Sequence, residues 1–226
     1  MSADNGIRGV RIVGQEELHE LEPHMNPDAK FALFNPNTGV LNPFELTIAL
    51  GEHAVLNGAK VLLNTEVTGI NTEDGKVVSV ETTQGTIETK IVINAAGLFS
   101  DKVAGMVEHV DYTVKPRKGV YFLYDKQYGD FIKRPIYSAP TAVSKGLIML
   151  PTTEGNILCG SNAILHDDKE DLSTDLESLN HIYSEAIHKY YPELPRMGDV
   201  TTIFAGNRAV SNTEDFISDI QKLFGE

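Results

Sequence analysis

Residues 91–105, IVINAAGLFSDKVAG, decide the fold expected for this chain. The stretch opens with a β-branched apolar run at 91–94, continues through the small residues 95–97 and becomes helix-like by Asp101. An apolar run without polar alternation predicts a strand buried on both faces of an α/β sheet. The small-residue turn after it is typical of a nucleotide site, because alanine and glycine let a ligand approach the backbone closely. A plain strand-to-helix turn explains the same residues.

A helix and a second strand are predicted upstream of this stretch. Asn42 can cap a helix that starts at Pro43, and apolar residues recur behind it at helical spacing. Gly58 ends the helix, and KVLLN at 60–64 predicts a strand. A helix that feeds a buried strand is half of a βαβ unit.

Short strands are expected between the two runs. Residues 67–96 contain three strand-like segments, separated by turns in which Gly75 and Gly85 can adopt positive φ. This pattern predicts an antiparallel meander.

After residue 110 the pattern is mostly β, with one amphipathic helix at about 175–190. Thr174 and Glu177 at its start fit a capping box.

The composition is that of a globular chain, and it excludes several classes of function. Apolar residues make up 41% and charged residues 23% of the 226 residues, and the formal net charge is −13. An acidic balance argues against nucleic acid as a partner, because nucleic-acid binders need a basic face. No stretch approaches the roughly 18 apolar residues of a membrane span, and the N-terminus lacks the apolar core of a signal peptide. A cytoplasmic location without an integral membrane segment follows by elimination.

Metal and disulfide chemistry are not expected. The single cysteine, Cys159, excludes an internal disulfide and lies in a strand-like run, which predicts a buried inert thiol. The seven histidines show no HxxxH or HExxH spacing, so no metal site is predicted. The run HDDKED at 166–171 lacks the ligand spacing of a calcium loop, and a solvated loop is the expectation there.

Four segments, taken in order, resemble a known family. They are FNPNTGVLNPFELTIALGEHAVLNGAKVLLNTEVTGI at 34–70, the stretch at 91–105, KPRKGVYFLYDK at 115–126, and FAGNRA at 204–209. The chain resembles the flavin-dependent oxidoreductases of the D-amino-acid oxidase and glycerol-3-phosphate dehydrogenase superfamily, especially the branch that includes L-2-hydroxyglutarate oxidases.

The resemblance implies an α/β plus α+β fold, in which a partial FAD-binding α/β sheet with a β-meander is interleaved with an antiparallel-sheet substrate domain. It assigns 37–110 to the FAD-binding domain. It assigns 1–36 and 111–208 to the substrate domain, and 209–226 to a segment that returns toward the FAD domain.

Two parts of the family pattern do not occur in this sequence. Relatives begin with a strand, a G-x-G-x-x-G turn and a helix that hold the cofactor diphosphate, and no such motif occurs among the 19 glycines here. Relatives also end with a segment that returns under the flavin ring. We therefore expect a central fragment of a longer enzyme, inactive and without FAD by itself, and we leave open whether Met1 is the native start.

The resemblance assigns four cofactor-binding residues. The position of Val67 is one where the family uses backbone groups to meet the adenine, and an ordinary buried valine is the alternative. Ala95, Ala96 and Gly97 match a turn that lies beside the diphosphate and ribose.

Two residues are assigned to the substrate in the same way. The stretch DVTTIFAGNRAV at 199–210 predicts a strand that enters a glycine turn. Arg208 matches a family arginine in such a turn that binds the substrate's phosphate or carboxylate, a role that suits the planar guanidinium fork. The proline that follows it in the family is Ala209 here, and a surface ion pair to Glu214 or Asp215 is the alternative. Tyr121 stands where glycerol-phosphate enzymes carry a histidine that faces the substrate, so it can hydrogen-bond an anionic substrate or simply pack.

The resemblance implies a flavin-dependent dehydrogenase or oxidase of a small anionic alcohol or 2-hydroxy acid, of the glycerol 3-phosphate or 2-hydroxyglutarate type, with hydride transfer to FAD N5. The catalytic base and the electron acceptor are not assigned. Two alternatives stay open. One is an amine or amino-acid oxidase of the same fold, and the other is a non-catalytic binding domain without flavin.

Overall fold

The computed structural model describes residues 6–107, 109–139, 146–194 and 199–212, and these divide into two compact units. Unit 1 comprises 1–48, 118–164 and 172–206, and unit 2 comprises 49–117, 165–171 and 207–226. Both units are thus built from segments that alternate along the chain. The fold is a mixed α/β one with antiparallel sheets.

A mixed set of long and short strands forms the main sheet. Its order is β10-β6-β9-β8-β7, and β11 also pairs with β6. The β6–β9, β9–β8 and β8–β7 pairs are antiparallel, as the β-rich pattern after residue 110 predicts. The strands are β6 (Val114–Tyr124), β7 (Ile136–Tyr137), β8 (Ile148–Pro151), β9 (Ile157–Gly160), β10 (Ile164–Leu165) and β11 (Val200–Ser211). A short 3-10 turn, η2 (Lys126–Tyr128), follows β6.

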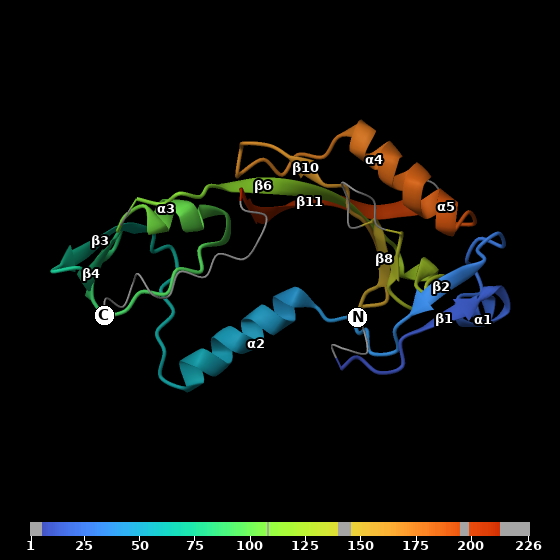
Figure 1. Ribbon diagram of the computed structural model, residues 1–226, viewed down its shortest axis with the longest axis horizontal. Helices are drawn as coiled ribbons and strands as arrows, with labels where there is room; N and C mark the ends of the chain where they lie inside the picture. Colours follow the sequence, from blue (N-terminus) through green and yellow to red (C-terminus); the bar gives the residue numbers. More distant parts are fainter. Residues whose placement is uncertain (1–5, 108, 140–145, 195–198, 213–226) are drawn as a thin grey trace. The chain divides into compact units, whose positions relative to one another are not determined.

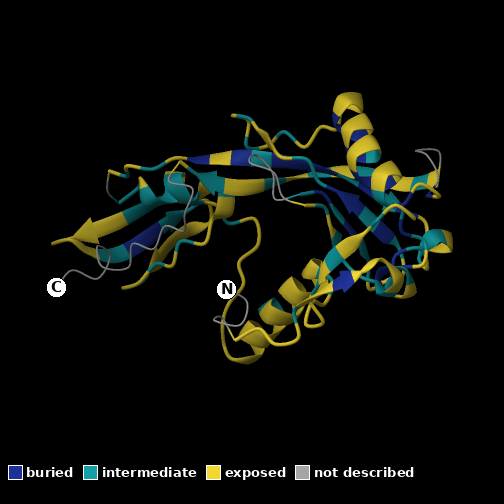
Figure 2. Cartoon of the chain, turned by 45° about the vertical axis from the view of Figure 1, so that its right-hand side comes forward, coloured by how far each residue is buried: buried dark blue, intermediate teal, exposed yellow. Residues whose placement is uncertain are grey.

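One helical run packs on this sheet in unit 1 and completes its core. It consists of α4 (Leu176–Ile182), a π-helical turn η3 (Tyr183–Ile187) and α5 (His188–Tyr190). Its apolar side chains meet the alternate residues of the strands, and Figure 2 shows the buried residues gathered in the strands beside it. The core residues from these two layers are Val120, Phe122, Tyr124, Met149, Ile157, Cys159, Leu179, Ile182, Ala186 and Ile187. The amphipathic helix is confirmed.

The cap of that helix differs from the prediction. Asp175, not Thr174, is the N-cap residue, and its carboxylate accepts from the backbone N–H of Ser178 at 2.7 Å. The hydroxyl of Ser178 donates to the same carboxylate, so the Thr174–Glu177 capping box is wrong. The backbone N–H and the hydroxyl of Ser178 lower the pKa of Asp175.

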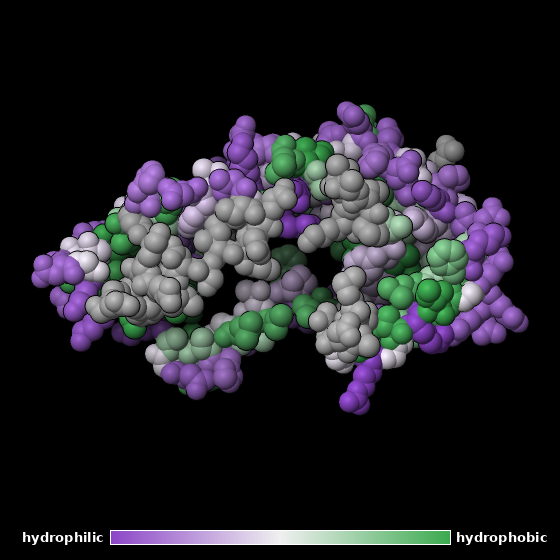
Figure 3. Space-filling model, viewed as in Figure 1, coloured by the Kyte–Doolittle hydropathy of each residue, from purple (hydrophilic) through white to green (hydrophobic). Residues whose placement is uncertain are grey.

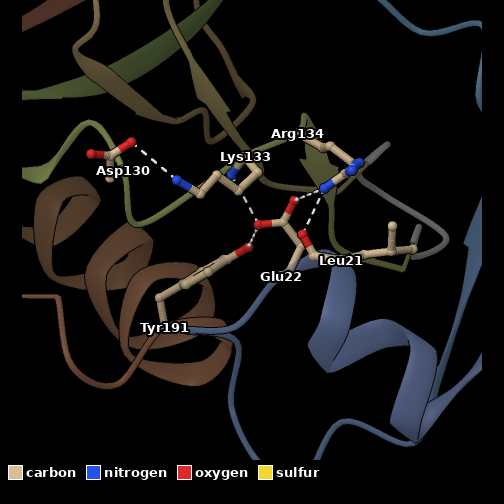
Figure 4. Close-up of polar contacts among 6 residues, drawn as sticks. All are labelled: Leu21, Glu22, Asp130, Lys133, Arg134 and Tyr191. Atoms are coloured by element: carbon tan, nitrogen blue, oxygen red, sulfur yellow. Dashed lines mark hydrogen bonds and ion pairs between the residues drawn. The ribbon is translucent and has the colours of Figure 1, made fainter.

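The N-terminal part of unit 1 is a two-stranded sheet with one short helix. Strands β1 (Arg11–Gly14) and β2 (Phe31–Phe34) pair antiparallel, and α1 (Gln15–Leu21) lies between them in sequence. Residue Glu22, which follows α1, is 1% exposed. Figure 4 shows that its carboxylate receives the backbone N–H of Lys133 at 3.0 Å and the hydroxyl of Tyr191 at 3.1 Å, while Arg134 approaches at 3.5 Å. Burial raises the pKa of Glu22 despite these partners.

Helix α2 (Pro43–Leu56) begins and ends as expected, but it buries none of its residues. The side-chain oxygen of Asn42 accepts from the N–H groups of Phe44 and Glu45 at 3.0 and 3.3 Å. The backbone beyond the helix turns at Gly58, whose φ is +93°. Figure 2 shows α2 exposed along nearly its whole length, and Figure 3 shows the apolar side chains that it presents.

Unit 2 contains the predicted meander. Strands β3 (Val67–Glu73), β4 (Lys76–Thr82) and β5 (Gly85–Glu88) pair antiparallel in that order. Figure 1 shows β3 and β4. Asp74 and Gly75 both have positive φ, as a two-residue hairpin turn requires, and Gly85 has φ +121°. The meander and its turn glycines are confirmed.

Two predicted strands are wrong. Residues 60–64 and 91–94 are not in strands, and Leu63 and Ile93 are 74% and 88% exposed. A strand exists through hydrogen bonds to a neighbour. Neither segment has a pairing strand among the described residues, so neither apolar segment forms part of a sheet there. The α/β sheet that these strands were expected to build is not formed by the described part of the chain.

None of the helices in the described residues is both long and apolar enough to cross a membrane.

Candidate functional site

The turn at Ala95, Ala96 and Gly97 is exposed and leads into the 3-10 turn η1 (Gly97–Phe99) and helix α3 (Ser100–Ala104). Asn94 holds the turn from both sides: its side-chain oxygen accepts from the Ala96 N–H at 3.2 Å, and its amide nitrogen donates to the Ser100 carbonyl at 2.8 Å. Gly97 has φ +55°, and a Cβ built there meets nothing within 4 Å. The turn is therefore a fixed backbone surface without bulky side chains.

Val67 is the first residue of β3, lies opposite Thr82 of β4 and is half-buried. In the described residues β3 is an edge strand, since the sheet order is β3-β4-β5. Glu66, next to Val67, forms an exposed ion pair of 3.5 Å with Lys102 of α3. This pair joins the start of β3 to the helix that follows the 95–97 turn, so the segments carrying the predicted cofactor residues are linked within unit 2.

These residues fit one part of a dinucleotide site. Methyl groups and glycine let a ligand reach the backbone, and an edge strand offers backbone groups to a purine edge. The sequence has no glycine-rich loop to bind the diphosphate from the other side. The described residues therefore fit a portion of the contacts that an FAD molecule needs.

Arg208 lies in β11 and is exposed. The expected glycine turn is wrong, because β11 runs without a break from Val200 to Ser211 and Gly206 is not among the positive-φ glycines. Pairing with β6 keeps the segment extended. Glu214 and Asp215, the alternative ion-pair partners, lie outside the described residues.

Tyr121 lies in β6 within unit 1 and is half-buried. Its ring stacks on that of Phe204 in β11, with centroids 5.3 Å apart and planes 16° from parallel. The partners come from two paired strands, so the ring of Tyr121 is held flat against a second aromatic ring. Phe204 is 42% exposed, which leaves this aromatic pair accessible from one side.

The loop at 165–171, which contains the HDDKED run, belongs to unit 2 and is partly buried. Lys169 Nζ lies 2.8 and 3.1 Å from the two carboxylate oxygens of Asp101 in α3. Burial alone would raise the pKa of Asp101, but the hydrogen bond from Lys169 and those from the backbone N–H groups of Val114 and Lys102 outweigh it and lower the pKa. The run is therefore a held loop and not the freely solvated one that was expected.

The cationic segment at 115–118 is part of strand β6. Lys115 forms an exposed ion pair of 2.8 Å with Asp167. Lys118 is 7% exposed and donates to the Ser173 hydroxyl at 3.2 Å. Strand alternation places Lys118 on the face opposite to Lys115 and Arg117, so the three cations do not form one cluster.

Cys159 is fully buried, and burial raises the pKa of its thiol, as an inert core cysteine requires. Among the described residues no three His, Cys, Asp or Glu side chains gather as metal ligands would.

Comparison with known proteins identifies the family. A family model described as FAD dependent oxidoreductase, abbreviated DAO, matches residues 1–224. The chain belongs to this family. This DAO-family chain is 37% identical over 213 residues to a glycerol 3-phosphate dehydrogenase of Caloramator mitchellensis, a match that covers 94% of the chain and 44% of that protein.

Two further relatives support the same family. The DAO-family chain is 26% identical over 230 residues to an L-2-hydroxyglutarate dehydrogenase of Indibacter alkaliphilus, covering 96% of the chain and 56% of that protein. The structure of L-alpha-glycerophosphate oxidase from Mycoplasma pneumoniae with FAD bound matches with a TM-score of 0.82 at 28% identity, covering 92% of this chain and 55% of the other. The chain spans about half the length of the relatives it matches.

The sequence analysis did not identify the residues that hold the 165–171 loop and the ring of Tyr121 in place. Asn207 and Lys169 hold the 165–171 loop, and Phe204 holds Tyr121. Asp101 and Lys169 are 68 residues apart in sequence, so no local pattern connects them. The one available signal is position: Asn207 directly precedes the predicted Arg208, and Asp101 follows the predicted turn by four residues.

Proposed function

We propose that this chain is part of an FAD-dependent dehydrogenase or oxidase that acts on a small anionic alcohol or 2-hydroxy acid, of the glycerol 3-phosphate or 2-hydroxyglutarate type. The observation that carries the proposal is the 37% identity to a glycerol 3-phosphate dehydrogenase over 94% of the chain. Because the chain spans 44% of that relative, the activity belongs to a whole protein that contains these residues.

Val67, Ala95, Ala96 and Gly97 are the residues proposed to hold FAD. The support is the open turn at 95–97, kept in place by Asn94, and the edge position of β3. When bound, FAD supplies the two-electron acceptor for the oxidation of the substrate carbon. The 226-residue chain alone is proposed to retain no FAD, because its sequence contains no phosphate-binding loop.

Arg208 is proposed to bind the anionic end of the substrate. It is exposed on an ordered strand, and its guanidinium can donate to two oxygens of a phosphate or carboxylate at once. Holding the anion fixes the position of the carbon that reacts, and such positioning can supply up to about 7–11 kcal/mol of a barrier. Tyr121 is proposed to add a hydrogen bond from a ring that Phe204 holds in place. No residue is assigned as the base.

The domain assignment is also a proposal: an FAD-binding domain at 37–110, a substrate domain at 1–36 and 111–208, and a return segment at 209–226. Support comes from the way the two compact units alternate along the chain, with 49–110 in unit 2 and 118–164 in unit 1. The bounds differ in part, because 37–48 lie in unit 1 and 111–117, 165–171 and 207–208 lie in unit 2. A cytoplasmic location and small anionic molecules as the partners complete the proposal.

A substrate panel tests this function. The whole FAD-loaded protein would be assayed with glycerol 3-phosphate, L-2-hydroxyglutarate, glycine and proline, with a dye as electron acceptor. We expect kcat/KM for at least one anionic alcohol to exceed that for both amino acids. Turnover of glycine or proline alone would assign an amine or amino-acid oxidase instead. Absence of bound flavin in the whole protein would favour a non-catalytic binding domain.

A further inference from the structure

Asn207, the residue before Arg208, ties β11 to the 165–171 loop by three side-chain hydrogen bonds. Its amide nitrogen donates to the carbonyl oxygens of Lys169 at 3.2 Å and Asp171 at 3.0 Å. Its amide oxygen lies 3.0 Å from Nε2 of His166. All of these residues belong to unit 2. One half-buried side chain therefore connects the strand to both ends of the loop.

The chemistry of these partners fixes how the amide is oriented. Carbonyl oxygens accept hydrogen bonds and never donate, so the Asn207 nitrogen must face Lys169 and Asp171. The Asn207 oxygen then faces His166, and Nε2 of the imidazole must carry the hydrogen that it donates. The amide makes three hydrogen bonds that agree with one another, which leaves it a single orientation.

The loop on which Asn207 rests is itself anchored. The backbone N–H of His166 donates to the Pro116 carbonyl of β6 at 3.2 Å. Lys169 binds the Asp101 carboxylate, whose second oxygen accepts the Val114 N–H at 2.9 Å. Lys169 Nζ also lies 5.5 Å from the centre of the Phe99 ring. The loop is therefore held at its His166 end and in its middle at Lys169, and it can restrain the strand that it contacts.

Neighbouring residues of a strand point to opposite faces. In β11 this alternation appears as a half-buried Asn207 followed by an exposed Arg208. A side chain fixed on one face determines the direction in which the next side chain leaves the other face. We propose that Asn207 is a positioning residue for Arg208, which sets the direction of its guanidinium toward the anionic end of the substrate. This inference rests on the proposed function.

A double-mutant cycle tests the proposal in the whole FAD-loaded protein. The variants are Asn207→Ala, Arg208→Ala and the double variant, and the measurements are KM and kcat with glycerol 3-phosphate and with L-2-hydroxyglutarate. We expect Asn207→Ala to raise KM about tenfold, the equivalent of one or two lost hydrogen bonds, with a smaller change in kcat. In the Arg208→Ala background the same change is expected to alter KM less than about twofold, because the residue it positions is gone.

Two further variants separate positioning from folding. Asp167→Asn removes an exposed ion pair of the same loop, and we expect KM and the melting temperature to stay unchanged. Asn207→Ser keeps one donor, and its KM should fall between those of Asn207 and Ala. The FAD content and melting temperature of each variant are measured in parallel. If neither Asn207 variant folds and binds FAD, the residue has a folding role and the positioning proposal is overturned.

The failures of the two proposals give different results. Equal KM factors for Asn207→Ala with and without Arg208, or no KM change while Arg208→Ala does raise KM, would overturn the positioning role alone. An unchanged KM in Arg208→Ala would overturn the assignment of Arg208 itself, and the positioning role with it. A readout independent of turnover is the imidazole nitrogen spectrum of His166, in which we expect the hydrogen on Nε2 in wild type and a tautomer mixture in Asn207→Ala.

Discussion

The ammonium nitrogen of Lys169 lies 2.8 Å from Oδ1 of Asp101, and this pair connects the loop at 165–171 to the helix that follows the 95–97 turn. The side chains of Asp101 and Lys169 are 16% and 23% exposed, so the pair is poorly solvated. The same carboxylate accepts the Val114 and Lys102 N–H groups. One carboxylate therefore organises three segments of unit 2.

Removing this carboxylate should destabilise unit 2. We expect Asp101→Ala to lower the free energy of unfolding by about 2–3 kcal/mol, since it leaves an ammonium and two backbone N–H groups without their partner. Chemical denaturation followed by circular dichroism measures the change. Lys102→Ala, which breaks an exposed ion pair, is the matched control and should cost less than about 0.5 kcal/mol. Equal losses in the two variants would contradict the structural role of Asp101.

The ion pair between Asp101 and Lys169 also predicts that stability falls at acid pH. The folded-state pKa of Asp101 is lowered, so its contribution is present above the unfolded pKa of about 3.9 and is lost as the pH falls through the folded value. The stability difference between wild type and Asp101→Asn should therefore shrink as the pH falls below about 4. A difference that grows on acidification would show that the carboxylate is not held as described.

For Glu22 we expect the opposite pH dependence of stability from that of Asp101. Its folded-state pKa is raised, chiefly by burial, so its contribution is fully present below the unfolded pKa of about 4.3 and is lost as the pH rises through the folded value. The free energy of unfolding of wild type relative to Glu22→Gln should fall as the pH rises above about 4.3. Urea unfolding across this range measures it, and a difference that rises with pH would refute the assignment.

The hydroxyl of Tyr191 is a buried partner of Glu22. We expect Tyr191→Phe to cost about 2 kcal/mol, because the buried Glu22 side chain loses a hydrogen-bond donor. Tyr190→Phe, at the neighbouring and partly exposed position, is the matched control and should change stability by less than about 0.5 kcal/mol. Thermal unfolding of both variants measures the difference. Similar melting temperatures for the two variants would argue against a stabilising hydrogen bond from Tyr191 to Glu22.

Gly97 gives a direct test of the cofactor turn. A methyl group at Gly97 meets no atom of the chain within 4 Å, yet the positive φ adds strain of about 1 kcal/mol. If the 95–97 turn contacts FAD as proposed, Gly97→Ala in the whole protein should weaken FAD binding by at least about tenfold, because the added methyl group would occupy space that the cofactor needs. Gly155→Ala is the control: its φ is +88° and its surroundings are also open, but it lies in the β8–β9 turn. Equal FAD affinity in the two variants would contradict the assignment of residues 95–97 to the cofactor site.

Local signals in the sequence predict the elements whose stabilising contacts are local. The meander follows from its glycine turns, and helix α2 from Asn42 and Pro43. The main sheet and its covering helix follow from the alternation and the helical stripe in the sequence. The same signals fail at 60–64 and 91–94, where an apolar run does not say whether a pairing strand is present.

Long-range contacts explain what the sequence did not show at the site. Glu22 is bound by residues more than 100 positions away, so its burial leaves no local pattern. The HDDKED run was judged by metal-ligand spacing, whereas its partners are Asn207 and Asp101 in other segments. Arg208 was expected in a turn because of Gly206, but pairing with β6 keeps that segment in a strand.

Anaerobic reduction of the flavin by substrate is the most direct test of the central claim. Glycerol 3-phosphate, and in parallel L-2-hydroxyglutarate, would be added without oxygen to the whole FAD-loaded protein and to its Arg208→Ala variant, with uncharged glycerol as the control. We expect one of the two anions to bleach the flavin absorbance of the wild-type protein, to require a concentration at least about tenfold higher in Arg208→Ala, and to be far more effective than glycerol. Bleaching by glycine or proline but by neither anion, or equal bleaching by glycerol, would contradict the account.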